Sequence, residues 1–172
     1  MKSLIYLRQP RPDDRAAFLE AVRRSQVLHR PWITAPATPA KFRAYLKQMS
    51  QPGNRAYLVC RRDTDEIAGV INLTNVILGA FRSGYLGYYA FAGHERQGLM
   101  CAGLKAVTGH ACSALRLHRL EANIQPGNAA SIALVRACGF RQEGYSPRYL
   151  KIGGRWCDHQ RWAILASRGN TA

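Results

Sequence analysis

Residues 92–100, Ala-Gly-His-Glu-Arg-Gln-Gly-Leu-Met, constrain the fold most, because they join an expected strand directly to an expected helix. The aromatic and apolar residues 85–91 are typical of a strand, and residues 99–115 are typical of a helix. A polar, glycine-containing turn of this kind leaves the first backbone N–H groups of the helix unpaired. Together with the helix dipole and the charge of Arg96, these groups would bind a phosphate or diphosphate. The same residues also fit an ordinary strand-to-helix turn.

The net charge is the unusual feature of the composition. The chain has 25 Lys and Arg residues against 10 Asp and Glu residues, a formal net charge of +15. This excess favours a polyanionic partner, such as RNA, the ribosome or an anionic cofactor. It also argues against a polyamine substrate, which a basic surface would repel. Solubility or a general basic bias of the proteome would produce the same composition.

The length and the apolar content predict one globular domain, residues 1–172. No apolar run approaches the roughly 20 residues that a membrane-spanning helix needs. Five cysteines is an odd number, and none of them has the CxxC spacing of a metal site. We therefore expect free thiols in a cytoplasmic protein, with no disulfide framework and no bound metal.

The order of the expected elements predicts an α+β fold. A strand at 4–7 is followed by helices at 13–24 and 39–50, three antiparallel strands at 56–62, 67–78 and 84–91, and a helix at 98–115. A strand at 119–125, a helix at 129–138 and a hairpin of 146–152 with 155–165 complete the list. We expect Thr38 and Asn128 to cap the helices that follow them. The helix at 98–115 is apolar on two faces, so we expect it to be widely buried.

Several motifs resemble the GNAT N-acetyltransferase superfamily. Its acetyl-CoA loop, [QR]-x-x-G-x-[GA], falls on residues 95–100, where Gly98 matches while Glu95 and Met100 depart from the pattern. Downstream, Leu-His-Arg-Leu-Glu-Ala-Asn-Ile at 117–124, Pro-Gly-Asn-Ala-Ala-Ser at 126–131 and Gly-Phe-Arg-Gln-Glu-Gly at 139–144 resemble the RimJ/RimL-type branch, which contains ribosomal-protein-alanine N-acetyltransferases. The resemblance implies a mixed, mostly antiparallel sheet of about seven strands, flanked by helices.

The resemblance also implies the cofactor and its binding residues. Acetyl-CoA would place its diphosphate on the amides of the loop and its pantetheine in a gap between two splayed strands, which end near residues 91 and 125. The backbone N–H groups around Phe91 and Ala92 would bind the thioester region and stabilise the tetrahedral oxyanion. The residues implied for the cofactor are Phe91, Ala92, Arg96, Gln97, Gly98, Leu99, Met100, Cys101, Asn123 and Asn128.

The catalytic residues implied are Glu121 and Ser131. Glu121 would be the general base or a ligand of the substrate amine; alternatively it forms a salt bridge with an arginine. Many family members protonate the leaving thiolate with a tyrosine, but Val135 stands at the matching position. Ser131 would then be the acid or a ligand of the cofactor, or else a helix-start residue only.

The acceptor remains open between three interpretations. The leading one is the N-terminal amine of a ribosomal protein, and the second is an antibiotic, amino acid or other small amine. The third is a non-catalytic protein that binds RNA or the ribosome and retains a vestigial site. We expect His29, Trp32 and Tyr149 to line the acceptor site, and the protein to be a monomer or a homodimer.

Overall fold

The computed structural model describes residues 3–166, which form one seven-stranded sheet with the strand order β1-β2-β3-β4-β5-β7-β6. The strands are β1 (Ile5–Arg8), β2 (Arg55–Arg61), β3 (Ile67–Ile77), β4 (Ser83–Ala90), β5 (Arg119–Ile124), β6 (Arg141–Ile152) and β7 (Arg155–Leu165). The helices are the 3-10 turn η1 (Pro12–Asp14), α1 (Arg15–Arg24), α2 (Gln26–His29), α3 (Pro39–Met49), α4 (Leu99–Ser113) and α5 (Ala129–Ala137).

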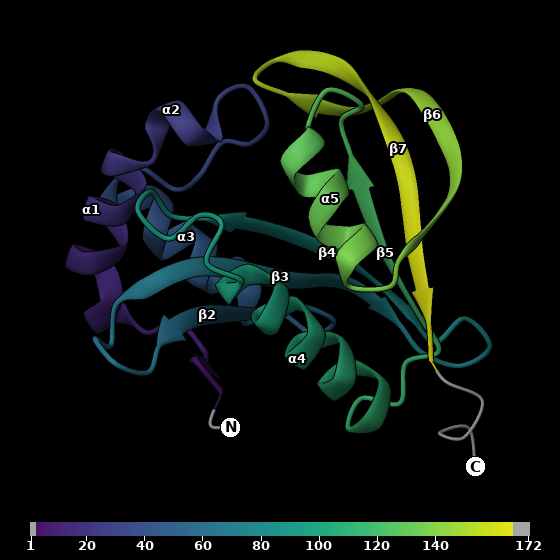
Figure 1. Cartoon of the computed structure of the whole chain (residues 1–172), viewed down its shortest axis with the longest axis horizontal. Coiled ribbons are helices and arrows are strands. Elements are labelled where there is room, and N and C mark those ends of the chain that lie inside the picture. The colour runs from purple at the N-terminus through teal and green to yellow at the C-terminus, as the bar shows by residue number, and fades with distance from the viewer. Residues whose placement is uncertain (1–2, 167–172) are drawn as a thin grey trace.

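All neighbouring strands are antiparallel except β4 and β5, which are parallel. A parallel pair needs a crossover connection, and α4 provides it. The register joins only Ser83–Tyr85 with Arg119–Glu121. Beyond this short contact the two strands diverge, β4 running beneath the N-terminal helices while β5 turns toward α5 (Figure 1). The expected splayed strand pair is present at this point.

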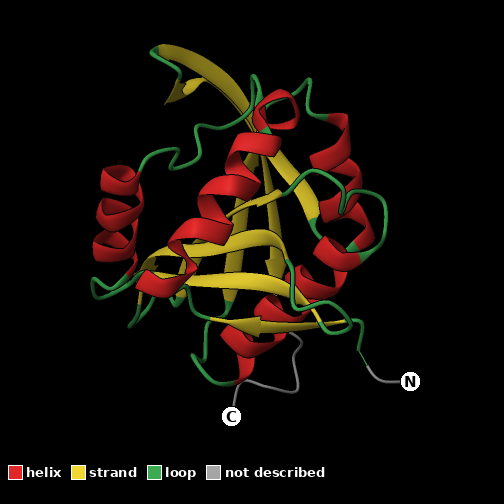
Figure 2. Cartoon of the chain, turned by 90° about the vertical axis from the view of Figure 1, so that its left-hand side faces the viewer, coloured by secondary structure: helices red, strands yellow, loops and turns green. Residues whose placement is uncertain are grey.

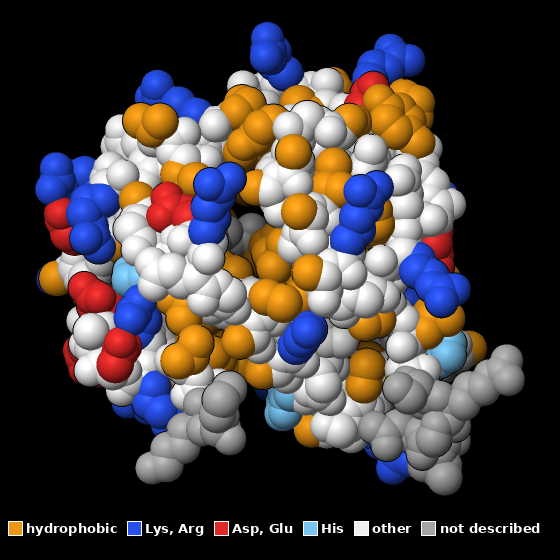
Figure 3. All heavy atoms as spheres, viewed as in Figure 1, with side chains coloured by type: hydrophobic (Ala, Val, Ile, Leu, Met, Phe, Trp, Pro, Cys, Tyr) orange, Lys and Arg blue, Asp and Glu red, His pale blue; other side chains and the backbone are white. Residues whose placement is uncertain are grey.

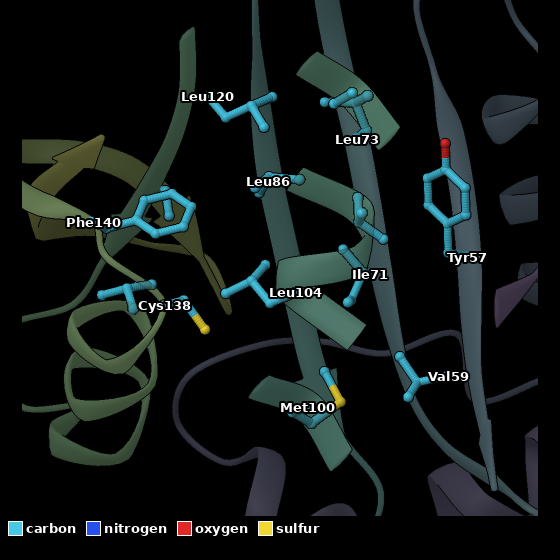
Figure 4. Packing of buried hydrophobic residues seen from close by; sticks show 14 of the residues in the cluster. Tyr57, Val59, Ile71, Leu73, Leu86, Met100, Leu104, Leu120, Cys138 and Phe140 are labelled. Atoms are coloured by element: carbon cyan, nitrogen blue, oxygen red, sulfur yellow. The ribbon is translucent and has the colours of Figure 1, made fainter. Parts of the chain in front are cut away.

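The helices cover both faces of the sheet (Figure 2). On one face α1 and α3 bury Phe18, Phe42 and Tyr45 against the inward side chains of β2 and β3. On the other face α4 and α5 pack against a second cluster that includes Leu104, Leu120 and further apolar residues of the sheet (Figure 4). The two clusters hold the splayed strands between two helical layers.

The close approach of α4 to β3 depends on Gly69. A Cβ at this position would lie 2.7 Å from the carbonyl oxygen of Tyr89 and would overlap the Met100 sulfur. Because backbone atoms cannot move aside cheaply, a larger residue would displace the start of α4. The first turn of α4 is therefore set against the end of β4, where the loop 92–98 begins.

Most of the expected elements are confirmed. The Thr38 hydroxyl accepts a hydrogen bond from the Lys41 N–H, and the Asn128 side chain accepts one from the Ser131 N–H, as expected for helix caps. Three expectations were wrong in detail. Residues 28 and 29, expected to begin a loop at 28–36, belong to the short helix α2; β6 begins at Arg141 rather than near 146; and Ala106, expected on the second apolar face of α4, is exposed.

Candidate functional site

The loop between β4 and α4 contains three residues with a positive φ angle, Gly93 (φ 91°), Arg96 (φ 59°) and Gly98 (φ 75°). These backbone conformations turn the chain from the strand into the helix. Gly98 is the N-cap of α4 and has no side chain to bond the first turn. The first helical hydrogen bond joins the Ala102 N–H to the Gly98 carbonyl. By their position, the N–H groups without an acceptor in the helix are those of Gly98, Leu99, Met100 and Cys101. This is a cradle suited to an anion.

Side chains of the loop hold it in shape. Glu95 accepts a hydrogen bond from the Gly93 N–H at 2.7 Å, and Gln97 donates one to the Gly93 carbonyl at 2.8 Å. Arg61 donates to the Gln97 side chain at 2.6 Å. Glu95, which departs from the family pattern, therefore bends back onto the loop backbone. The exposed Arg96 adds positive charge to the loop.

His94 was missed at the sequence level. Only 7% of its surface is exposed, and its Nδ1 atom is buried without a hydrogen-bond partner among the described residues. A histidine between Gly93 and Glu95 in a polar loop gave no sign that it would turn inward. The loop before α4 therefore contains one buried polar atom without a hydrogen-bond partner.

The gap between the splayed strands exposes peptide groups of β4. The Phe91 N–H bonds to the Ala68 carbonyl on β3. Alternate residues of an antiparallel strand face the same neighbour, so the peptide groups of Tyr88 and Ala90 face the gap. Figure 3, viewed as in Figure 1, shows a hollow between the loop 92–98 and α5. Apolar side chains lie in this hollow, and Lys or Arg side chains lie at its rim.

The oxyanion assignment to Phe91 and Ala92 is wrong for this structure. The Phe91 N–H donates to Ala68 at 2.8 Å, and the Ala92 N–H donates to the Ser25 hydroxyl at 2.8 Å. Neither amide is available to a thioester oxygen. The sequence could not show this, because Ser25 lies 67 residues from its partner. The gap-facing N–H groups of Tyr88 and Ala90 are the donors that the backbone offers instead.

Ser131 and Asn128 lie at the start of α5. The Asn128 side chain caps the helix through the Ser131 N–H at 3.1 Å, and the Ser131 hydroxyl lies 2.7 Å from the Tyr88 hydroxyl. Burial raises the pKa of Tyr88. Val135 is buried in the core of this layer. Tyr88 therefore brings a phenol to Ser131 from the neighbouring strand, a contact that the sequence spacing did not reveal.

Glu121 forms a salt bridge with an arginine, which was one of the alternatives expected for it from the sequence. Its Oε1 accepts a hydrogen bond from Arg119 Nε at 2.7 Å, and Arg119 also pairs with Glu143 on β6. Arg119 above all, and Arg161 to a smaller extent, lower the pKa of Glu143. Burial, with a further contribution from Glu121, raises the pKa of Tyr85. These residues form one cluster on the sheet face opposite α4 and α5.

The expected acceptor residues fall into two groups. Tyr149 lies beside this cluster, since it contributes to the raised pKa of Tyr85, and its ring centroid is 6.2 Å from that of His159. His29 is buried and bonds through Nε2 to the Ala90 carbonyl at 2.8 Å. The Trp32 carbonyl accepts a hydrogen bond from Gln125 at 3.2 Å. The segment 25–32 thus reaches the ends of both splayed strands.

The cysteines carry no metal or disulfide chemistry in the described structure. All five thiols are free, and the Cys101 and Cys138 sulfurs lie 3.4 Å apart between α4 and α5. Burial raises the pKa of Cys138 to about 12. Between residues 3 and 166, no three His, Cys, Asp or Glu side chains come together as a metal-binding group. Nor does any helix there combine the length and apolar character needed to cross a membrane.

Comparison with known proteins identifies the family. The model of the acetyltransferase (GNAT) domain matches residues 5–141. The chain belongs to the GNAT acetyltransferase family. Members of this family use acetyl-CoA to acetylate an amine, so the cofactor is acetyl-CoA and the enzyme is an acyltransferase.

Individual relatives extend the comparison. The chain is 40% identical over 97 residues to the ribosomal protein uS5-alanine N-acetyltransferase of Escherichia coli; the match covers 56% of the chain and 50% of that relative, so the chain spans about half of its length. Mycobacterium smegmatis RimJ in complex with CoA-disulfide is 28% identical, with a TM-score of 0.87 over 94% of this chain and 82% of that one. Spermidine N-acetyltransferase from Vibrio cholerae, at 19% identity and a TM-score of 0.81 over 99% of both chains, shares the fold.

The residues present fit acetyl-CoA. The unpaired amides of the first turn of α4 suit its diphosphate, and the gap-facing N–H groups of Tyr88 and Ala90 suit the carbonyls of pantetheine. When bound, acetyl-CoA supplies an activated acetyl thioester. The chain's residues would then hold this thioester in the gap and bring an amine to it from the sheet face that carries Glu121.

We predict that Gly98→Trp abolishes CoA binding. The left-handed backbone of Gly98 strains any side chain, and an indole would cover the amides of the first turn of α4. The matched control is Gly109→Trp, since a Cβ at that exposed position of α4 meets nothing within 4 Å. Calorimetric titration with CoA should show binding for wild type and control only. Equal affinity of Gly98→Trp and wild type would contradict the assignment of the loop.

Proposed function

We propose that this protein is a cytoplasmic enzyme that acetylates a protein N-terminal α-amine, of the ribosomal-protein-alanine type. The observation that carries the proposal is the charge balance of the acceptor face, which is the sheet face opposite α4 and α5 that carries Glu121. Glu121 and Glu143 both pair with Arg119, and Arg161 lies close enough to affect Glu143. The cluster has two carboxylates and two guanidiniums, so its formal charge is zero. A polyamine with several ammonium groups would find no surplus negative charge there.

The acid–base properties of amines support the same acceptor. An α-amine has a pKa of about 7.7–8.0, whereas a lysine-type amine has a pKa of about 10.4. At pH 7 roughly one α-amine in ten is neutral and nucleophilic, but fewer than about one lysine-type amine in a thousand is. A site whose carboxylates are already paired is better suited to the amine that loses its proton more easily. A surface with a net charge of +15 increases this preference.

The proposed reaction uses the two hydroxyls and the carboxylate described above. The N–H groups of Tyr88 and Ala90 would polarise the thioester carbonyl in the gap. Glu121 would bind the acceptor amine or take its proton. The Ser131 hydroxyl, held by Tyr88 at 2.7 Å, would return a proton to the leaving thiolate. In this account Tyr88 and Ser131 together replace the tyrosine that is absent at Val135.

The basic surface supports an acceptor bound to the ribosome. Residues 21–62 contain no Asp or Glu, although they include the last turn of α1 and all of α2 and α3. Lys and Arg side chains are scattered over the face shown in Figure 3, with few acidic ones. Such a surface would draw the enzyme to rRNA and so to a nascent or assembled ribosomal protein. The relative from E. coli, named for ribosomal protein uS5-alanine, is consistent with this acceptor.

We predict a clear order of acceptors at pH 7. A peptide with a free N-terminal alanine should give a kcat/KM at least about tenfold above that of spermidine or of an N-blocked peptide containing lysine. Its kcat/KM should rise with pH and level off at about pH 9, one pH unit above the pKa of the α-amine, where that amine is mostly neutral. Thiol release measures all three reactions. A preference for spermidine or for another small amine would contradict the peptide acceptor and establish the alternative substrate class.

We predict that Glu121→Gln lowers kcat about 100-fold, as expected for loss of a group that assists proton transfer. The matched control is Glu143→Gln, which also removes a partner of Arg119 but lies on β6. Because Glu143→Gln changes the charge of the same cluster without removing the proposed base, it should lower kcat at least about tenfold less than Glu121→Gln does. Melting temperatures of both variants separate loss of the ion pair from loss of catalysis. Equal changes in kcat would reduce Glu121 to an anchor for Arg119.

A further inference from the structure

Three buried side-chain polar atoms in residues 3–166 have no hydrogen-bond partner: Tyr89 Oη, His94 Nδ1 and Asn123 Oδ1. A buried polar group left unpaired costs about 1–3 kcal/mol, so each such group in a native protein calls for an explanation. All three belong to residues in or next to the splayed strands β4 and β5. His94 lies in the loop before α4, Tyr89 lies on β4 and Asn123 lies on β5. All three therefore follow the path assigned to acetyl-CoA and its acceptor.

Tyr89 and Asn123 share one face of the sheet. The parallel register pairs Tyr85 with Glu121, and paired residues point to the same side. Counting two residues along β5 gives Asn123, and counting four along β4 gives Tyr89. They thus stand on the two diverging strands, on the acceptor face, with Glu121 next to Asn123. The opposite face is occupied by Ala122 and Ile124, which are buried against the helical layer of α4 and α5.

The neighbours of Tyr89 do not satisfy its hydroxyl. Its ring contacts are aromatic, with centroid distances of 5.1 Å to His29 and 5.7 Å to Phe91. Tyr45 lies close enough to raise the pKa of Tyr89, but the Tyr45 hydroxyl donates to the Asn72 side chain at 2.8 Å. The ring of Tyr89 is thus held by packing, while its buried oxygen has no hydrogen-bond partner.

We propose that Asn123 Oδ1 and Tyr89 Oη bind the two N–H groups of the neutral acceptor amine. A carbonyl oxygen is an acceptor only, and a phenol oxygen can accept as well as donate. Two such oxygens on either side of the gap direct the nitrogen lone pair toward the thioester between the strands. The proposal rests on the proposed function, which supplies the amine. It reassigns Asn123, expected from the sequence to bind the cofactor, to the acceptor.

The proposal gives the enzyme a preference that the charge balance alone does not. An amine needs two N–H groups to satisfy both oxygens, so a primary amine fits and a secondary amine leaves one oxygen unpaired. A peptide whose N-terminal alanine is N-methylated should therefore be a poor acceptor. With one hydrogen bond lost, its kcat/KM should fall about tenfold or more below that of the unmethylated peptide.

The test uses Tyr89→Phe and Asn123→Leu, with Asn123→Ala as a second variant in case leucine disturbs folding. Each should lower kcat/KM for the alanine peptide about tenfold or more and leave the CoA affinity unchanged. Tyr89→Phe should also reduce the difference in kcat/KM between the alanine and N-methylalanine peptides, because one of the two oxygens is gone. Its melting temperature should be equal to or above that of wild type, since an unpaired hydroxyl is removed.

The matched control is Tyr45→Phe, which removes a hydroxyl that does have a partner. It should lower the melting temperature and leave the discrimination between the two peptides intact. Unchanged kcat/KM in both Tyr89→Phe and the Asn123 variants would overturn the proposal, as would equal turnover of the two peptides by wild type. Weakened CoA binding in the Asn123 variants would return that residue to the cofactor. A wild type that binds acetyl-CoA but acetylates no amine would instead refute the proposed function.

Discussion

β4 and β5 pair at only three positions before they part, and the functional site depends on this short contact. A backbone N–H or C=O that loses its strand partner must find another, because burying it unpaired is costly. The peptide groups of Tyr88 and the N–H of Ala90 are in this position, while the Ala90 carbonyl bonds to His29. If β4 and β5 stayed paired to their ends, each would hydrogen-bond these groups of the other and no gap would remain. The divergence therefore creates the amide-lined channel into which a pantetheine can be received.

Two devices keep the strands apart in a defined geometry. On one side α4 packs on the sheet through the space left by Gly69, which brings its unpaired amides to the entrance of the channel. On the other side the segment 25–32 bonds to the ends of both strands, with Ser25 on Ala92, His29 on Ala90 and Trp32 on Gln125. Burial lowers the pKa of His29, which favours the neutral ring that donates to Ala90. The splay is thus braced by side chains far apart in the sequence.

The elements and the cofactor loop could be predicted from the sequence because their signals are local. Glycine at 98, the caps at Thr38 and Asn128, and the two-residue period of the strands each report on their immediate neighbours. The contacts that decide the site are not local. Whether the Phe91 amide is free depends on Ala68, and the partner of Ser131 is Tyr88, 43 residues away. Burial of an unpaired oxygen, as in Tyr89, leaves no trace in a single sequence.

The central claim is that coenzyme A lies along the first turn of α4 and in the gap between β4 and β5. Residue-resolved amide hydrogen exchange, with and without CoA, tests it most directly. The account predicts that CoA slows exchange at the amides of Tyr88 and Ala90 and at those of residues 98–101, and leaves Phe91 unchanged, because that amide is already bonded to Ala68. Protection confined to another site, such as the open groove of about 790 Å³ beside the end of α3, would contradict it.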